Sequence, residues 1–532
     1  MVCRGVQIDR SRYATCLRFA LLAAGAVLTA LTLVFPNIGI LEWITLVPAG
    51  IVILNMTDSG IKLRRAYLWG LYFFMCYGLT LFHWFFELYP MEFTGMSRGA
   101  AMVVVMAGWA GLSFLQAIAA ALIFPAMVLF GRSPIVRRFP IFKPFLMAGM
   151  WVMMEWGQTL FWFGVPWGKL AMGQVCVTVM ARAAALFGSY FVTFMIVGVG
   201  MLIALAVVEP PRVRLASLLA GGLVVLELVL GVGVTLAGRT DDDSKATVRV
   251  AVLQGNVSSS DKWHVGVDEI ITRYASLCRD AAGRGAELII WPETAVPISV
   301  DRNPARRDRL CDIAYENDVD MLVGAFTHDE NGGERNSLVL FRRDGTVSDE
   351  IYSKRHLVPF GEYLPLRRFI MTVIPPLSQV AMLENDLVPG EDSGLIGVGD
   401  TKVGSLICFD SIYEELTRRS VLDGAELIVL STNDSWFGDS AALRMHCAHD
   451  QLRAIESDRT ILRAANTGIS AMICPDGTMP QQLDDNVEGL LVCDAEIRTG
   501  RTLYTIIGNL FVYLAIAFIF GMGAASVITS KH

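Results

Sequence analysis

Eight long apolar stretches constrain this 532-residue chain more than any other feature of its sequence. A helix needs about 20 mainly apolar residues to cross the hydrocarbon core of a bilayer, and most of the stretches are that long. Hydrophobic residues make up 54% of the chain and charged residues only 18%, which is too apolar for an ordinary soluble domain. The sequence therefore predicts a polytopic α-helical membrane protein with about eight transmembrane helices. The stretches are 18–35, 40–56, 66–88, 100–130, 145–163, 177–208, 214–237 and 504–526.

Basic residues flank these stretches unevenly. If the N-terminus is cytoplasmic, the short outside loops hold Arg98 and Lys169, whereas the inside segments hold many more basic residues. The positive-inside rule then places both termini in the cytoplasm and residues 245–500 on the outer face. An Arg-rich start before an apolar run also fits a signal peptide, but six further stretches follow at once, which favours a retained first helix. The inside basic residues are Arg4, Arg10, Arg12, Arg18, Lys62, Arg64, Arg65, Arg132, Arg137, Arg138, Lys143, Arg212, Arg214 and Lys531.

The segment 245–500 has the composition of a soluble globular domain. Apolar, β-branched runs bounded by polar turns predict strands, and runs with helical spacing lie between them, so we expect an α/β domain. The chain then has three parts: a seven-helix transmembrane bundle at 1–240, this domain at 245–500 and the eighth helix at 504–526. Predicted strands cover 247–257, 286–297, 319–326, 336–345, 403–410, 426–434 and, as a pair, 460–477; predicted helices cover 267–283, 303–317 and 441–457.

Three residues of this domain could carry chemistry. Glu293 follows Trp-Pro at the end of one predicted strand, Cys408 ends another, and Lys354 lies in a loop. The ends of strands are where α/β folds place functional groups. Each residue also has an ordinary interpretation, because Glu and Lys are usually solvated and a Cys that ends an apolar strand is usually a small buried hydrophobe. None of the three supports a functional prediction alone.

Together with their surrounding motifs, these residues resemble the Glu–Lys–Cys triad of the nitrilase superfamily. The whole chain, with its eight apolar stretches, resembles the apolipoprotein N-acyltransferase family. The most specific matches are HLVPFGEYLP (356–365) and NDSWFGDS (433–440). The resemblance implies an extracytoplasmic, nitrilase-like αββα sandwich attached to the membrane bundle. The other matching motifs are LQGNV (253–257), WPETAVP (291–297), YSK (352–354), ICFD (407–410), LRAIESDR (452–459) and RAANTGIS (463–470).

The resemblance implies a role for each member of the triad. Cys408 is the nucleophile, which must become a thiolate to attack. Glu293 is the general base that takes the thiol proton, and Lys354 stabilises the oxyanion of the tetrahedral intermediate. The backbone N–H after Cys408 is a second oxyanion donor. Glu362 is a second acidic residue that positions the lysine and the substrate; a loop salt bridge is the alternative.

Five further residues are expected to support the site. Trp263 and Trp436 lie in matched motifs and suit a mobile loop over the site, with an aromatic belt at the membrane interface as the alternative. Asn336 matches a family asparagine, although a turn residue at the start of a strand fits equally well. Phe409 and Asp410 stand where better-known family members carry Tyr and Glu. Phe409 keeps the aromatic ring of Tyr but lacks its hydroxyl. Asp410 keeps the charge of Glu, but its side chain is shorter by one methylene.

The resemblance also implies the reaction and its location. Cys408 attacks the sn-1 ester of a phospholipid, with phosphatidylethanolamine as the expected donor, and a thioester acyl-enzyme forms. The α-amino group of an S-diacylglyceryl cysteine on an apolipoprotein then accepts the acyl chain. The enzyme would lie in the bacterial cytoplasmic (inner) membrane, with its catalytic domain on the outer, periplasmic face. Its partners would be the bilayer, the phospholipid donor and the apolipoprotein acceptor.

Other ligands and functions are less favoured by the sequence. The reaction needs no metal or diffusible cofactor, and the 10 Cys and 7 His show no metal-ligand spacing. A net charge of −7 gives no basic surface, so nucleic acid is not an expected partner. Two alternatives remain: a membrane-tethered carbon–nitrogen hydrolase (amidase) that discharges the same thioester to water, and an inactive scaffold. An opening toward the membrane near Cys408 would favour the lipid substrate, and one toward water would favour the hydrolase.

Overall fold

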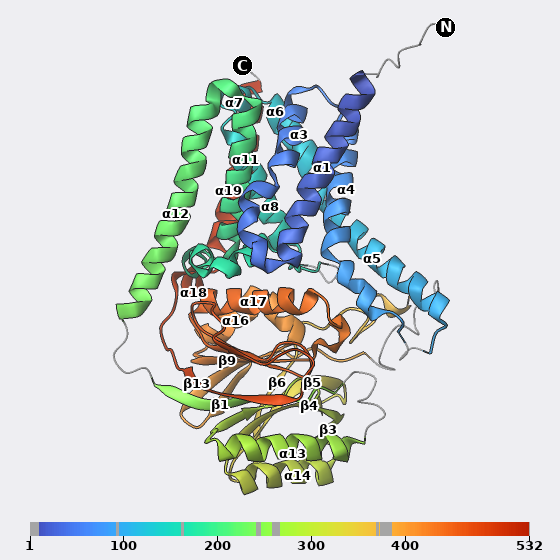
Figure 1. Cartoon of the computed structure of the whole chain (residues 1–532), viewed down its shortest axis with the longest axis vertical. Helices are drawn as coiled ribbons and strands as arrows, with labels where there is room; N and C mark the ends of the chain where they lie inside the picture. Colours follow the sequence, from blue (N-terminus) through green and yellow to red (C-terminus); the bar gives the residue numbers. More distant parts are fainter. Residues whose placement is uncertain are drawn as a thin grey trace, which may run out of the picture.

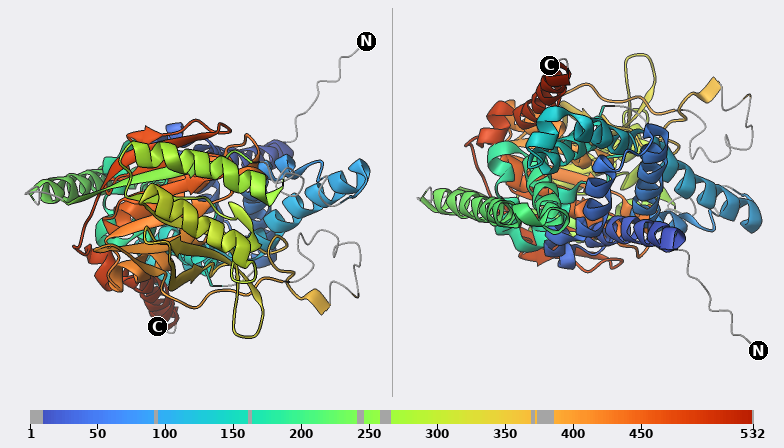
Figure 2. Two further views of the ribbon diagram at one scale, coloured as in Figure 1. Left: turned by 90° about the horizontal axis from the view of Figure 1, so that it is seen from below. Right: turned by 90° about the horizontal axis from the view of Figure 1, so that it is seen from above.

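The computed structural model describes residues 10–91, 95–160, 164–240, 246–257, 266–368, 372 and 386–530. A bundle of helices stands on a sandwich of two β-sheets (Figure 1). Helix α1 begins and helix α19 ends at the end of the bundle farthest from the sandwich. Seen along the long axis, α5 (blue) and α12 (green) extend to opposite sides of the molecule (Figure 2). The apolar stretches and the polar segment 245–500 thus form separate layers of one structure.

The bundle contains long helices joined by short helical turns. Short 3-10 turns, marked η, lie at the ends of several spans because the chain reverses direction there. The elements are α1 (Arg10–Val34), η1 (Pro36–Leu41), α2 (Glu42–Thr45), α3 (Val47–Asp58), α4 (Leu63–Leu81), η2 (His83–Leu88), α5 (Arg98–Ala120), α6 (Ile123–Arg132), α7 (Pro134–Arg138), α8 (Phe142–Gly157), η4 (Leu170–Val177), α9 (Thr178–Ala181), α10 (Ala184–Phe187), α11 (Ser189–Val208), η5 (Pro210–Arg212), α12 (Val213–Thr240), α18 (Leu503–Ile507) and α19 (Leu510–Ser530).

Six helical segments in the described part of the chain are long and apolar enough to cross a membrane. The predicted stretches 66–88 and 145–163 correspond to α4 and α8, which lie outside that set; α8 has only 16 residues. Both pack inside the bundle, α4 against α1 and α5, and α8 against α11 and α19. The stretch 177–208 is not one helix, because Gly188 takes a φ of +81° between α10 and α11. The six segments are Ala14–Val34, Pro36–Asp58, Arg98–Arg132, Ser189–Val208, Pro210–Gly238 and Leu510–Thr529.

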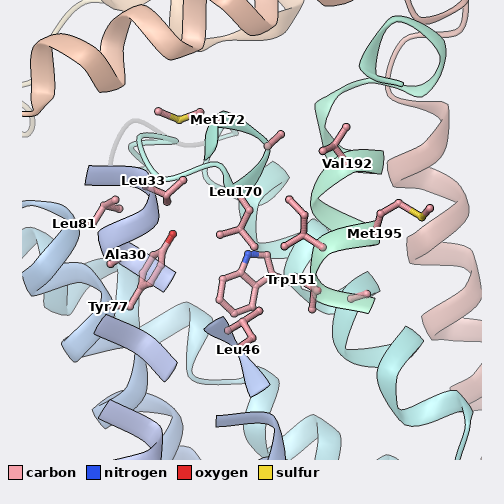
Figure 3. Close-up of a cluster of buried hydrophobic side chains, with 14 of the residues drawn as sticks. Ala30, Leu33, Leu46, Tyr77, Leu81, Trp151, Leu170, Met172, Val192 and Met195 are labelled. Carbon is pink, nitrogen blue, oxygen red and sulfur yellow. The ribbon is translucent and has the colours of Figure 1, made fainter. Parts of the chain in front are cut away.

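Trp151 of α8 lies at the centre of the bundle core, surrounded by side chains from several helices (Figure 3). Its ring is fully buried and meets the ring of Tyr77 edge-on, with 6.0 Å between centroids. Its indole N–H donates to Glu155 at 3.1 Å, and Thr193 donates to the same carboxyl at 2.8 Å. Because a polar group buried in a bundle must find its partners within the protein, these bonds fix the helices around α8.

The sandwich is built from two sheets within the described residues. In the first, with order β13-β1-β2-β4-β5-β6, β1, β2 and β4 are parallel, and β3 also pairs with β4. In the second, with order β12-β11-β10-β9-β8-β7, β8, β9 and β10 are parallel. The strands are β1 (Thr247–Gln254), β2 (Leu288–Ile290), β3 (Val296–Ser299), β4 (Asp320–His328), β5 (Glu334–Phe341), β6 (Val347–Ser353), β7 (Leu395–Val398), β8 (Thr401–Ile407), β9 (Leu427–Thr432), β10 (Ile461–Ala465), β11 (Ala471–Ile473), β12 (Gln481–Gln482) and β13 (Gly489–Glu496).

Apolar side chains fill the space between the sheets and beneath the helices on either side. Val252 and Leu340 of the first sheet share one buried cluster with Val429 and Leu462 of the second. Helices α13 (Val267–Gly283) and α14 (Pro304–Asn317) cover the first sheet. Helices α16 (Glu414–Leu422) and α17 (Ala442–Ser457) cover the second sheet and face the bundle (Figure 1). The predicted α/β domain is therefore an αββα sandwich whose α16–α17 layer also contacts the bundle.

Buried contacts connect this layer to the bundle. Lys169 Nζ lies 2.9 Å from Glu414 Oε2, and both side chains are at most 3% exposed. The Phe437 ring packs against those of Trp84 and Trp167, with centroids 5.0 and 5.4 Å away. Moving the sandwich relative to the bundle would separate this buried ion pair and leave each charge uncompensated, which is costly. These contacts therefore hold the sandwich in a fixed orientation beneath the bundle.

Candidate active site

The three predicted triad residues lie at strand ends on the same edge of the sandwich. Glu293 follows β2 and Lys354 follows β6, both in the first sheet, and Cys408 follows β8 in the second. Strands β2 and β6 run in the same direction, because β6 and β5 are antiparallel and so are β5 and β4. The carboxyl ends of these strands therefore meet at one edge, which is where α/β folds collect functional groups.

Glu293 is 6% exposed, and three of its contacts orient its carboxylate. Lys354 Nζ lies 3.0 Å from Oε1, and Asn336 Nδ2 donates to the same oxygen at 2.7 Å. The backbone N–H of Asn433, beyond β9, donates to Oε2 at 2.8 Å. The carboxylate is thus oriented from both sheets, as a base with a fixed direction of proton transfer requires.

Lys354 is 1% exposed and lies between two carboxylates. Its Nζ is 2.9 Å from Glu362 Oε1 as well as 3.0 Å from Glu293 Oε1. Burial alone would lower the pKa of the Lys354 ammonium, but the charges of Glu293 and Glu362 raise this pKa well above its usual value. Glu362 is itself held by the backbone N–H of Val358, 2.8 Å from Oε2. Lys354 therefore stays a fixed cation.

Cys408 occupies a strained backbone position. Its φ is +49°, in the left-handed region that a residue with a Cβ rarely adopts, and strain of this kind is concentrated at functional sites. The thiol is free and partly buried. Burial raises the pKa of the Cys408 thiol; the Glu293 charge raises it further and the Lys354 charge lowers it. The resting thiol therefore keeps its proton until a base removes it.

Asp410 fixes the turn that carries Cys408. It is fully buried in η8 (Cys408–Ile412), and its Oδ2 accepts from Tyr352 Oη at 2.7 Å and from the Ile407 N–H at 3.1 Å. Its Oδ1 accepts from the backbone N–H of His356 at 2.8 Å. Burial raises the pKa of the Asp410 carboxyl to about 6, while these hydrogen bonds oppose the rise. The shorter acid at this position thus ties the Cys408 turn to the loop that follows Lys354.

The other predicted supporting residues have different surroundings. Asn336 lies within β5 rather than in a turn, and its Nδ2 also lies 3.1 Å from Glu362 Oε1. Phe409 is partly buried and meets the Tyr413 ring edge-on at 5.7 Å. Trp436 is partly buried in η9 (Asp434–Phe437). This turn directly follows Asn433, whose backbone N–H donates to Glu293. Trp263 lies outside the described residues.

Sequence reasoning missed a buried ionic network behind Cys408. Arg463 forms ion pairs with Asp434 and Asp450, and all three side chains are fully buried. His446 bridges from this network to the nucleophile: its Nδ1 lies 3.0 Å from Asp434 Oδ1 and its Nε2 lies 3.3 Å from the Cys408 carbonyl oxygen. Arg463 and Asp434 belong to motifs quoted above, but their pairing depends on long-range packing that spacing does not reveal.

Asp434→Asn is expected to destabilise the protein by about 3 kcal/mol at pH 7, because it removes one of the two buried carboxylates that pair with Arg463 and leaves only Asp450. Burial would raise the pKa of Asp434, but Arg463 and His446 lower it to about 2. This folded-state pKa is below the usual value, so the stabilisation is present above about pH 4 and is lost as the pH falls toward 2. The difference in stability between wild type and Asp434→Asn should therefore shrink as the pH is lowered from about 4 toward 2.

Thermal unfolding in detergent micelles, followed by tryptophan fluorescence, measures this difference. Asp494→Asn is the matched control, because Asp494 forms an exposed pair with Arg249 in which the side chains are 58% and 45% exposed. Exposed pairs contribute about 0–1 kcal/mol. Equal losses in the two variants would contradict a special role for the buried network.

Residues 249–503, which include the sandwich and the thiol, carboxylate and ammonium grouped at its edge, match the carbon–nitrogen hydrolase family. Residues 25–202 match the N-terminal domain of apolipoprotein N-acyltransferase. The chain belongs to the apolipoprotein N-acyltransferase family and is an acyltransferase of the carbon–nitrogen hydrolase superfamily.

Relatives align over most of the chain. The apolipoprotein N-acyltransferase of Gloeobacter violaceus is 31% identical over 505 residues, which cover 92% of this chain and 90% of the relative. That of Pasteurella multocida is 27% identical over 87% of this chain and 86% of its own. Among solved structures, an amidase of the nitrilase superfamily from Nesterenkonia AN1 is 20% identical, covering 51% of this chain and 98% of its own with a TM-score of 0.38.

Proposed function

We propose that this enzyme transfers an acyl chain from a membrane phospholipid to the α-amino group of the S-diacylglyceryl cysteine of apolipoproteins. Phosphatidylethanolamine is the proposed donor. The observation that carries the proposal is the position of the triad beneath the helix bundle, beside a cavity of about 420 Å³. Thr159 and Leu160, which follow α8, line this cavity together with Arg355, next to Lys354. A cavity lined by both the bundle and the catalytic domain suits a membrane lipid better than a small water-borne amide.

In the first half-reaction, Glu293 accepts the proton of the Cys408 thiol while the sulfur attacks the carbonyl carbon of the sn-1 ester. Lys354 and the backbone N–H after Cys408 stabilise the oxyanion of the tetrahedral intermediate. The bond between the carbonyl carbon and the glycerol oxygen then breaks, and Glu293 returns its proton to that oxygen. A lysophospholipid leaves, and the acyl chain stays on Cys408 as a thioester.

In the second half-reaction, the α-amino nitrogen of the acceptor cysteine attacks the thioester carbonyl. Glu293 accepts a proton from this nitrogen, and the same two donors stabilise the second oxyanion. The carbon–sulfur bond breaks, the Cys408 sulfur regains a proton from Glu293, and an amide-linked acyl chain is released with the lipoprotein. No metal or diffusible cofactor takes part in either step.

The remaining residues act by positioning. Glu362 orients Lys354, and Asn336 orients Glu293. Asn336 also donates a hydrogen bond to Glu362, which links the two positioning residues. Asp410 holds the Cys408 turn, and Phe409 packs against Tyr413 beside it. From the resemblance alone, we assign Trp436 and Trp263, the latter outside the described residues, to a loop over the site. These roles follow the family resemblance and the contacts described above.

We further propose that α4 and α8 complete a set of eight spans in the bacterial cytoplasmic membrane. Residues 1–240 form the bundle, 245–500 the catalytic domain on the outer, periplasmic face, and 504–526 the eighth span. Two observations support this orientation. Basic residues are concentrated in the predicted inside segments. Helix α1 begins and helix α19 ends at the end of the bundle opposite the sandwich (Figure 1).

Intact mass spectrometry of the purified enzyme after incubation with phosphatidylethanolamine tests the proposal. We expect an added acyl mass on the wild type, none on Cys408→Ala, and discharge of the adduct when an S-diacylglyceryl cysteine peptide is added. An adduct that water discharges equally fast without the peptide would indicate a hydrolase. The absence of any adduct on reduced wild type would contradict the phospholipid donor.

A further inference from the structure

The cavity beside the site is shared by the bundle and the catalytic domain. Thr159 and Leu160 line it from the turn after α8, and Arg355, Tyr363 and Tyr413 line it from the catalytic domain. Its volume of about 420 Å³ is within the range of small-molecule sites. This volume is larger than a few ordered waters need. A ligand in this cavity would therefore contact both the bundle and the catalytic loops.

Two residues of the cavity wall adjoin site residues in the chain. Arg355 directly follows Lys354, and Tyr363 directly follows Glu362. The backbone N–H of Arg355 also donates to Asp410 Oδ1 at 3.2 Å, which ties this wall to the turn that carries Cys408. A group bound at the Arg355 side chain would thus lie beside the position at which the oxyanion forms.

Arg355 is the cation of this wall for which the described part of the chain provides no neutralising partner. Its partly buried guanidinium makes no hydrogen bond or ion pair within the described residues. Asp386 also lines the cavity, but its carboxylate accepts from Arg367 at 2.9 Å and from the Leu364 N–H at 2.8 Å. Burial, together with the Arg355 charge, lowers the pKa of His356 to about 4, so this neighbour is neutral at physiological pH.

We propose that Arg355 binds the phosphate of the phospholipid donor and thereby selects phosphate-bearing esters for transfer. This inference rests on the proposed function. A guanidinium matches two phosphate oxygens with parallel N–H donors, and a partly buried cation without a protein partner gains most from such a ligand. In a glycerophospholipid, the phosphate and the sn-1 ester are on opposite ends of one three-carbon glycerol. A phosphate held at Arg355 therefore brings the ester next to Lys354 and Cys408.

The test compares wild type, Arg355→Ala, Arg355→Lys and the control Arg419→Ala, since Arg419 is 62% exposed on α16. The rate of Cys408 acylation is measured against phosphatidylethanolamine concentration in mixed micelles, and against a p-nitrophenyl ester that has no phosphate. We expect Arg355→Ala to raise the KM for the phospholipid about tenfold to a hundredfold, with a much smaller change in kcat. Arg355→Lys should recover part of the loss, and Arg419→Ala should behave as wild type.

Each other outcome overturns the inference in a recognisable way. Unchanged phospholipid dependence in Arg355→Ala, with normal acylation of wild type, would refute the phosphate site and leave the proposed function intact. Equal losses for both esters, or loss of folding in Arg355→Lys as well, would assign Arg355 a structural role. Strong inhibition by inorganic phosphate that Arg355→Ala abolishes, without an altered KM for lipid, would indicate a site for free phosphate. Wild type that reacts with the p-nitrophenyl ester but never with phospholipid would refute the donor itself.

Discussion

Replacing Lys354 with methionine is expected to slow acylation of Cys408 by about a hundredfold to a thousandfold, because one donor to the oxyanion is lost. Folding should also suffer. The Lys354 ammonium lies within 3.0 Å of both Glu293 and Glu362, and without it a buried and a partly buried carboxylate share one site. Loss of one partner from a buried ionic group costs roughly 3–5 kcal/mol. Single-turnover acylation and thermal unfolding in micelles measure the two effects.

Without the ammonium, the Glu293 and Glu362 carboxylates repel each other across the site. The double variant Lys354→Met/Glu362→Gln removes one of the two charges and should recover stability without recovering the rate. Recovery of both would contradict a direct role for Lys354 in the reaction.

The apolar stretches predicted the bundle well because length and hydrophobicity are local properties. Six helical segments of the described chain fit a membrane span, and the strands that carry Glu293 and Cys408 lie where apolar runs predicted them. The break at Gly188 was missed, since an apolar run of 177–208 has no signal for a change of direction except that glycine. Strand β6, which delivers Lys354, was also missed, because its sequence VSDEIYS lacks a continuous apolar run.

The geometry of the site depends on pairings that are remote in sequence. The register of β5 against β6 places Ser337 opposite Ser353, and this pairing brings Asn336 beside Lys354. The backbone N–H of Asn433 reaches Glu293 only because the two sheets pack face to face. Family resemblance identified the triad, but the left-handed conformation of Cys408 follows from tertiary constraints that no local motif expresses.

Glu293→Gln is expected to reduce acylation of Cys408 by up to about 10,000-fold, the upper range for loss of a general base. The size of this effect depends on the Cys408 thiol as much as on the loss of the Glu293 carboxylate. Burial raises the pKa of Cys408, so hardly any thiolate exists at neutral pH without a base. Glutamine keeps the shape of the side chain and can still accept from Asn336 or from the Asn433 N–H, so the fold should survive.

Rapid-quench mass spectrometry across pH 6 to 10 separates this mechanism from an alternative in which Lys354 alone generates the thiolate. If Glu293 is the base, the residual rate of the Gln variant should increase about tenfold per pH unit, because only spontaneous ionisation then supplies the thiolate. Glu287→Gln, at a carboxylate before β2 that lies outside the site, is the matched control and should leave the wild-type profile in place. A flat pH profile in Glu293→Gln at near wild-type rate would mean that a Cys408 thiolate already exists in the resting enzyme, and the assignment of Glu293 as base would fall.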